Sequence, residues 1–146
     1  MTKYYRFVEF IPSKALPALL ASVLRRSSFI LAVHILTEPF ISVLCGLPED
    51  VKKYSSVFLD GEKRALNDYA VDRLIKCGYR RVYYVNSLHA KVIVTSELVI
   101  LGSANLSERA LSNIESVALV KIRPERIPGL ARLLEDVRSR AVPAKV

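Results

Sequence analysis

The chain is short of the residues that most often build metal and redox sites. Its 146 residues include two cysteines, two histidines, no tryptophan and no glutamine. Cys45 and Cys77 form no CxxC motif, and neither histidine has a second Cys or His ligand close by. We therefore expect no metal ion and no cofactor. We also expect both cysteines to be small, buried, free side chains in a reducing compartment.

Long hydrophobic runs are also missing. The longest apolar region, residues 29–47, is interrupted by His34 and by the Glu38-Pro39 pair, whereas a membrane span needs about twenty predominantly apolar residues. The N-terminal sequence MTKYYRFVEF lacks the apolar core of a signal peptide. These absences predict a cytoplasmic protein with no stable membrane association.

Positive charge is in excess. The net charge is +8, and 51% of the residues are hydrophobic, which suits a single globular domain over residues 1–146. The basic residues recur in clusters at Arg25-Arg26, Lys52-Lys53, Arg80-Arg81 and Arg123/Arg126. A solvated helix end or loop explains any one cluster. Their sum favours a polyanionic partner, either nucleic acid or an anionic membrane surface.

The apolar periodicity alternates between that of strands and that of helices. It predicts strands at residues 4–11, 29–36, 54–59, 81–85, 89–95, from about 98, and 114–122. It predicts helices at residues 14–26, 39–44, 62–77, 107–112 and 126–140, with a loop after Pro48. Strands that alternate with helices indicate an α/β layered fold, and adjacent late strands indicate a mixed sheet.

The most informative region lies between residues 89 and 115. A strand that starts at His89 puts His89 and Lys91 on one face, because side chains alternate along a strand. The next strand puts Ser103 and Asn105 on a common side, and a hairpin through residues 95–97 would gather all four at one end of a sheet. This set suits displacement at phosphorus: an imidazole attacks while a cation and neutral donors hold the oxygens.

These residues resemble the phospholipase D superfamily, whose signature is HxK, four residues, Asp, then GSxN or GSxxN and a later Glu. The matching residues, in order, are His89-Ala90-Lys91, Gly102-Ser103-Ala104-Asn105 and Glu115. The resemblance implies a phospholipase D-like α/β fold, with a mixed sheet flanked by helices on both faces. It also implies metal-independent phosphodiester chemistry through a phosphohistidine intermediate.

One position departs from the signature. The family has Asp where this chain has Ser96, with Glu97 beside it. The position falls in the predicted hairpin turn, where Asp and Ser both hydrogen-bond nearby backbone, and its strand parity is opposite to that of His89 and Lys91. We interpret Ser96 as a turn substitution. The alternative is a degenerate site that has lost activity.

Each matched residue has an expected role. The neutral imidazole of His89 is the nucleophile, and Glu115 is the expected carboxylate that orients it and fixes its tautomer. Lys91 and Asn105 are expected to hold the phosphoryl oxygens as cation and amide donor. Ser103 is expected to add a hydroxyl to the same phosphate-binding set.

The single motif predicts an assembly. Departure of the leaving group needs a general acid, and the family uses the histidine of a second HxK motif for this step. His34 lies in an apolar run without a motif, so we assign it to the core or to a strand end. The general acid must then come from a second copy of His89, which predicts an obligate homodimer with one composite site on its axis.

The sequence favours a nuclease that cleaves DNA or RNA, without indicating which. A phospholipase or phosphatidyl transferase is an alternative, although no amphipathic membrane-binding segment stands out. A non-catalytic nucleic-acid-binding subunit is another, suggested by Ser96. A metal-dependent nuclease built on Glu49, Asp50 and Lys52 is a weaker alternative, because it depends on a short Asp-x-Lys match.

Overall fold

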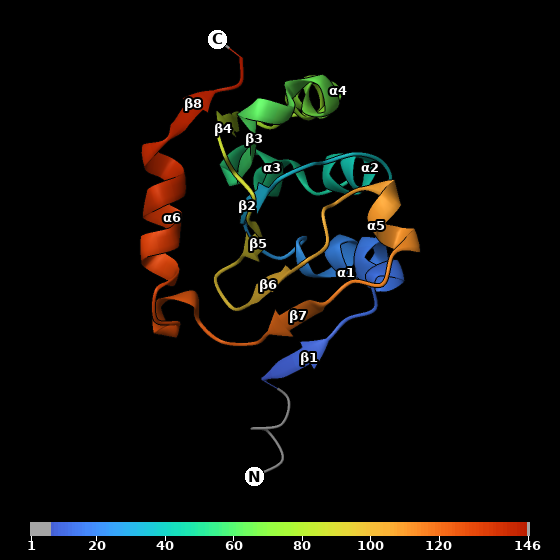
Figure 1. Ribbon diagram of the computed structural model, residues 1–146, viewed down its shortest axis with the longest axis vertical. Helices are drawn as coiled ribbons and strands as arrows, with labels where there is room; N and C mark the ends of the chain where they lie inside the picture. Colours follow the sequence, from blue (N-terminus) through green and yellow to red (C-terminus); the bar gives the residue numbers. More distant parts are fainter. Residues whose placement is uncertain (1–6, 146) are drawn as a thin grey trace.

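A mixed eight-stranded sheet forms the centre of the computed structural model, which describes residues 7–145 (Figure 1). From one edge to the other the strands are β1 (Val8–Phe10), β7 (Val117–Val120), β6 (Val99–Gly102), β5 (Lys91–Val94), β2 (Ile30–Val33), β3 (Ser56–Asp60), β4 (Arg81–Val85) and β8 (Ala141–Pro143). Strands β2, β3 and β4 pair in parallel, and all other neighbours pair antiparallel. The predicted mixed sheet is confirmed. Residues 4–6 of the first expected strand lie outside the described residues.

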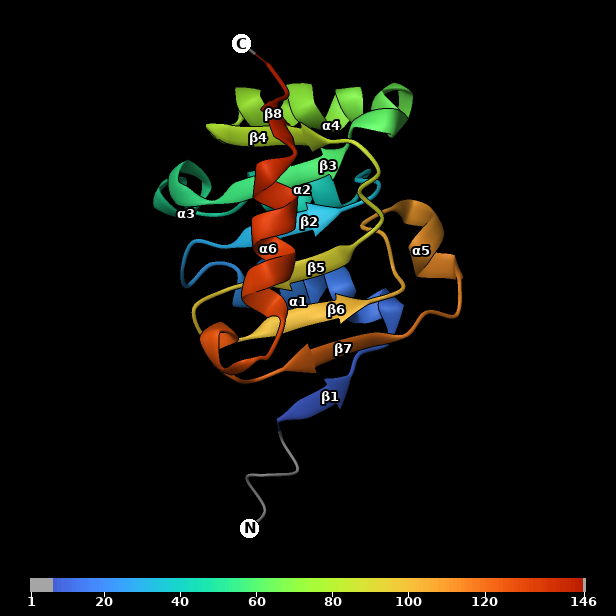
Figure 2. The same cartoon turned by 60° about the vertical axis from the view of Figure 1, so that its left-hand side comes forward.

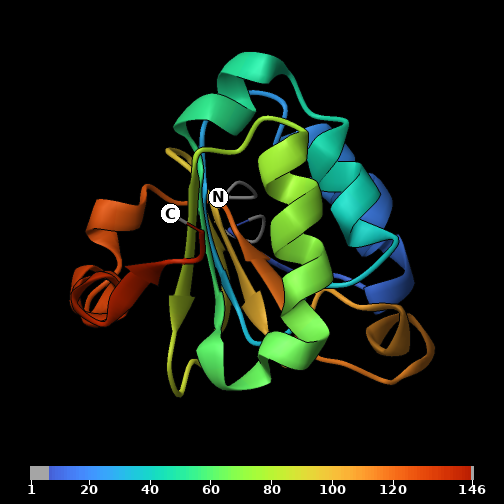
Figure 3. The same ribbon diagram turned by 90° about the horizontal axis from the view of Figure 1, so that it is seen from above.

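Helices cover both faces of this sheet (Figure 3). One face carries α1 (Leu16–Val23), α2 (Phe40–Cys45), α4 (Arg64–Lys76) and α5 (Glu108–Ser112), and the other carries α6 (Leu130–Ser139). The remaining elements are α3 (Glu49–Tyr54) and the 3-10 turns η2 (Ser13–Ala15), η3 (Gly61–Lys63) and η4 (Pro124–Arg126). Among the described residues, no helix is long and apolar enough to cross a membrane.

The strands bury apolar side chains on both faces. In β2, Leu31 and Val33 join the large core cluster under α1, α2 and α4. Ala32, between them, faces the opposite way and packs with Phe58 and Leu130 in the smaller cluster under α6. This two-sided burial explains why the central strands read as continuous apolar runs.

Three segments differ from the sequence predictions. The segment after Pro48, expected to be a loop, is helix α3, and its acidic first turn and basic last turn suit the helix dipole. The short C-terminal strand β8 was not predicted, because it exists only through its pairing with β4. The expected strand 89–95 is shorter, so His89 precedes β5.

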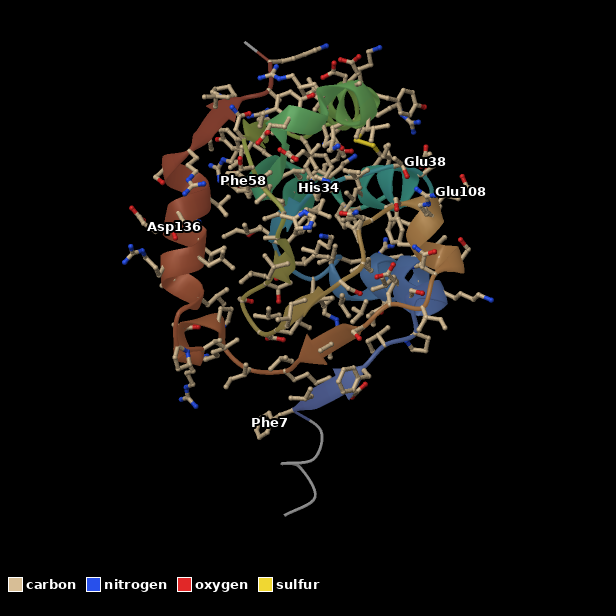
Figure 4. The ribbon with its side chains drawn as sticks, viewed as in Figure 1. Phe7, His34, Glu38, Phe58, Glu108 and Asp136 are labelled. Atoms are coloured by element: carbon tan, nitrogen blue, oxygen red, sulfur yellow. A yellow bond between two sulfur atoms is a disulfide. The ribbon has the colours of Figure 1, made fainter. Side chains whose placement is uncertain are left out.

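The prediction of two free cysteines was wrong. Cys45, at the end of α2, and Cys77, just after α4, form a disulfide with a Cα–Cα distance of 5.6 Å (Figure 4). The two residues are 32 positions apart, and their helices pack side by side on the same face of the sheet. Sequence spacing alone gives no sign of this contact.

Candidate active site

Antiparallel pairing gathers the predicted residues at one end of the sheet. Val33 of β2 pairs with Lys91 of β5, and Gly102 of β6 pairs with Val117 of β7. The C-terminal ends of β2 and β6 therefore lie beside the N-terminal ends of β5 and β7. These ends are next to α5 (Figure 2), and the five predicted site residues are located at or just beyond them.

The nucleophile predicted from the motif lies just ahead of β5. His89 is exposed, and Lys91 is half-buried at the first position of the strand. The Lys91 Nζ atom donates a hydrogen bond of 3.0 Å to the backbone carbonyl of His89. The ring of His89 packs edge-to-face against the ring of His34, with centroids 4.9 Å apart and an interplanar angle of 77°.

The hairpin between β5 and β6 turns where the sequence predicts. The Thr95 backbone N–H donates to the Leu98 carbonyl at 3.0 Å. The Thr95 hydroxyl oxygen accepts from the backbone N–H groups of Glu97 and Leu98 at 3.2 and 3.1 Å. Ser96 is exposed in this turn. Thr95 therefore supplies the local side-chain bonds of the turn, which explains how the hairpin forms without an aspartate at position 96.

Ser103 and Glu115 form a tight pair between β6 and β7. The Ser103 hydroxyl donates to Oε1 of Glu115 at 2.5 Å and accepts from the Ser116 backbone N–H at 2.9 Å. The other Glu115 oxygen accepts from the Asn113 amide at 3.3 Å. Within residues 7–145, no hydrogen bond joins Glu115 to His89, so its expected orienting role stays a prediction.

Asn105 uses one side of its amide to connect two loops. Its Oδ1 atom accepts a hydrogen bond of 3.1 Å from the backbone N–H of Ile35. A parallel bridge between Leu36 and Leu106 continues this contact. The amide is half-buried, and in the described part of the chain its nitrogen makes no hydrogen bond. Its donor is therefore available, and the phosphate-binding role expected of Asn105 stays a prediction.

Three residues that the motif does not contain complete this end of the sheet. They are His34 after β2, Asp60 at the end of β3, and Asn67 on α4. Asn67 is fully buried; it accepts from the Leu36 N–H at 3.1 Å and donates to the His34 and Asp60 carbonyls at 3.0 and 3.2 Å. The sequence carries no spacing signal for these contacts, because the partners of His34 and Asn67 lie on other elements.

The connection from His34 to α2 is held by an ionised carboxylate. Burial opposes ionisation of Glu38, but hydrogen bonds from Ser42 and the Arg73 guanidinium keep the pKa of Glu38 below its ordinary value. The Glu38 carboxylate accepts from the Ser42 N–H at 2.9 Å and pairs with Arg73 at 3.1 Å. The Glu38–Arg73 pair therefore ties this loop to α4.

The residues of the metal-nuclease alternative lie elsewhere. Glu49, Asp50 and Lys52 are on α3, which leads into the N-terminal end of β3 and so lies at the opposite end of the sheet. The Lys52 ammonium group bonds Glu49 at 2.8 Å and the Cys45 carbonyl at 3.1 Å. In residues 7–145, no group of three or more His, Cys, Asp or Glu residues is placed to hold a metal ion.

Comparisons with known proteins find relatives by structure. No protein-family model matches the sequence, and no curated protein matches it. Nuc from Salmonella typhimurium, a phospholipase D family member, has a TM-score of 0.78 over 95% of this chain and 97% of its own, at 17% identity. Phosphatidylserine synthase from Haemophilus influenzae has a TM-score of 0.76 over 97% of this chain and 40% of its own, at 12% identity. TrmBL2, an archaeal chromatin protein with a novel mode of DNA binding, has a TM-score of 0.63 over 94% of this chain and 55% of its own, at 13% identity.

The chain therefore has the phospholipase D fold. The resemblance that the motif residues predicted is confirmed at the level of the fold. The mixed sheet with helices on both faces, expected from that resemblance, is confirmed with it.

Proposed function

We propose that this protein is a metal-independent phosphodiesterase that cleaves nucleic acid. The observation that carries the proposal is the position of His89, Lys91 and Asn105 at one end of a sheet with the phospholipase D fold. Phosphoryl transfer requires a nucleophile that attacks phosphorus, and a cation and an amide donor that stabilise the phosphoryl oxygens.

The proposed reaction has two steps. A lone pair on an imidazole nitrogen of His89 forms an N–P bond, and the P–O bond to the leaving group breaks. The leaving oxygen keeps the electrons and takes a proton from a general acid. Water then attacks the phosphohistidine, loses its proton to the same group, and releases His89. Lys91, Asn105 and Ser103 are the proposed phosphate-binding residues.

The general acid is proposed to be His89 of a second copy of the chain. The motif occurs once in the sequence, so a two-fold axis that brings two His89 side chains together supplies both catalytic histidines. The functional unit in this proposal is a homodimer with one composite site.

A cytoplasmic location is part of the same proposal. Structural disulfides in the cytosol are usual in hyperthermophiles, so the Cys45–Cys77 disulfide fits this location in an organism of that kind.

The net charge of +8 favours nucleic acid as the substrate. Among the structural relatives, TrmBL2 is described as binding DNA, whereas the synthase is named for a phospholipid product. DNA and phospholipids are both phosphodiesters. A lipid enzyme and a non-catalytic DNA-binding subunit therefore remain the outcomes that an experiment must separate.

One experiment separates them. The full-length protein is incubated with single- and double-stranded DNA and RNA, and with phospholipid vesicles, in EDTA. We expect cleavage of nucleic acid, and a loss of at least about 10³-fold in His89→Ala, because the nucleophile is removed. Ser96→Ala, on the exposed turn of the same hairpin, is the matched control and should retain activity.

The other outcomes each contradict part of the proposal. Cleavage that appears only after Mg²⁺ is added would contradict a metal-independent reaction. Nucleic-acid binding without cleavage would favour the non-catalytic subunit, and hydrolysis of phospholipid alone would favour the lipid enzyme.

A further inference from the structure

The strand order places the second histidine of the chain beside the proposed nucleophile. β2 lies between β3 and β5, and Val33 pairs with Leu59 on one side and Lys91 on the other. His34 is the next residue, in the middle of the molecule between α6 and α2 (Figure 4). It therefore lies between Asp60, at the end of β3, and the segment that enters β5.

Both polar contacts of the His34 ring are made by the same nitrogen. Its Nδ1 atom lies 2.9 Å from Oδ2 of Asp60 and 3.0 Å from the backbone carbonyl oxygen of Leu88. An ionised carboxylate and a carbonyl can only accept hydrogen bonds, so Nδ1 must carry the proton. In a neutral ring Nε2 is then the unprotonated nitrogen, and the carboxylate sets the tautomer of His34.

The Asp60–His34 pair is held rigidly. The Asp60 side chain is 5% exposed, and its second oxygen accepts a hydrogen bond of 3.0 Å from the backbone N–H of Glu62. The buried amide of Asn67 bonds the carbonyls of both His34 and Asp60. Neither residue can shift without breaking a hydrogen bond that is buried or partly buried, which is costly.

This rigid pair contacts two consecutive residues of the nucleophile's segment. His34 bonds the carbonyl of Leu88 and packs edge-to-face on the ring of His89. Among the described residues, the His89 ring makes no side-chain hydrogen bond, so the contact with His34 is what restrains an otherwise exposed ring. An imidazole held by a carboxylate thus lies against the ring that would become positively charged on attack.

We propose that His34, held by Asp60, is the positioning residue for His89. It restrains the His89 ring in the orientation for attack, and the carboxylate behind it stabilises the positive charge that the ring gains as the N–P bond forms. His34 exchanges no proton in this step; the leaving oxygen is protonated by the general acid. The inference rests on the proposed phosphodiesterase function and gives His89 a restraint within its own chain.

The contact can be tested without substrate, because the chain has two histidines and so two imidazole spin systems. In NMR spectra of the full-length protein we expect a nuclear Overhauser effect between the two rings. We also expect long-range ¹H–¹⁵N correlations that show neutral His34 protonated on Nδ1. No effect between the rings, or His34 protonated on Nε2, would overturn the proposal.

The catalytic role is tested with His34→Phe, which keeps a ring but loses the N–H, and with Asp60→Asn, which keeps an acceptor but loses the charge. Ser96→Ala, on the exposed turn of the β5–β6 hairpin, is again the control and should keep the wild-type kcat. We expect kcat to fall about 10–100-fold in both variants, because small displacements of a reacting group cost this much. KM should change less than about threefold. Thermal unfolding followed by circular dichroism shows which variants are folded. If His34→Phe is not folded, the kcat of the isosteric Asp60→Asn alone tests the role.

Two leaving groups distinguish positioning from proton donation. A positioning residue slows cleavage of an oligonucleotide and of a p-nitrophenyl phosphodiester to the same extent. A general acid matters little for p-nitrophenolate, which leaves without a proton. A loss confined to the oligonucleotide would therefore overturn the positioning role, as would wild-type kcat in both variants. If His89→Ala is also fully active, the proposed function fails instead.

Discussion

At the scale of single residues, the site depends on side chains that bond the backbone of distant elements. Asn67 is the clearest case, because one buried amide satisfies the Leu36 N–H and the carbonyls of His34 and Asp60. It joins α4 to the ends of β2 and β3. The position of His34, and through it of His89, depends on this amide.

Replacing Asn67 should therefore weaken both the fold and the site. We expect Asn67→Ala to lower the free energy of unfolding by about 2–4 kcal/mol, because buried backbone groups lose their partners. Urea denaturation measures this change. The exposed Asn86→Ala is the control and should change stability by less than about 0.5 kcal/mol. Equal stability of the two variants would show that water replaces the amide without cost.

The sequence predicts the residues of the site only where they are close together in the chain. His89, Lys91 and Asn105 stand in one short ordered region, so their types and spacing are visible. His34 and Leu88 are 54 positions apart, and Asn67 and His34 are 33 apart. The sequence shows no spacing that would join them, because their contact is created by the order of the strands.

At the scale of elements, β6 and β7 approach closely because Gly102 has no side chain. A Cβ atom at Gly102 would lie 1.9 Å from the backbone oxygen of Ser116. The next residue, Ser103, donates to Glu115 across the same strand pair. The glycine of the motif therefore sets the strand spacing that the Ser103–Glu115 pair needs.

Gly102→Ala should force these strands apart. We expect a loss of about 1–3 kcal/mol in the free energy of unfolding, the usual cost of overpacking, with a loss of activity. Thermal or urea unfolding measures the first and the cleavage assay the second. Gly46→Ala is the control, since its Cβ would meet its nearest neighbour at an acceptable 3.4 Å. Unchanged stability in Gly102→Ala would contradict the close approach.

The elements themselves were predictable where local signals are strong. The apolar run of β2, the amphipathic α4 and the hairpin between β5 and β6 all form where the sequence predicts them. The segments that were missed are short: α3 has six residues and β8 has three. Their formation depends on packing and strand pairing, which periodicity over a few residues does not reveal.

At the scale of the whole molecule, two long-range links remain beyond the reach of sequence patterns. The Cys45–Cys77 disulfide joins the ends of α2 and α4 across 32 positions. The proposed second copy would supply the other His89. Both depend on which distant surfaces come into contact. The spacing of residues in this one sequence does not indicate those contacts.

The central claim is that His89 forms a covalent bond to phosphorus in a composite site. The most direct measurement is a single-turnover reaction quenched in alkali, where a phosphohistidine survives, followed by intact-mass and peptide mass spectrometry. We predict one adduct, in which the His89 nitrogen is bonded to the phosphate with the remaining nucleic-acid fragment still attached, in at most one of the two chains of each dimer, and no adduct in His89→Ala. Rapid turnover with no adduct on His89, or full activity from a monomer, would contradict the account.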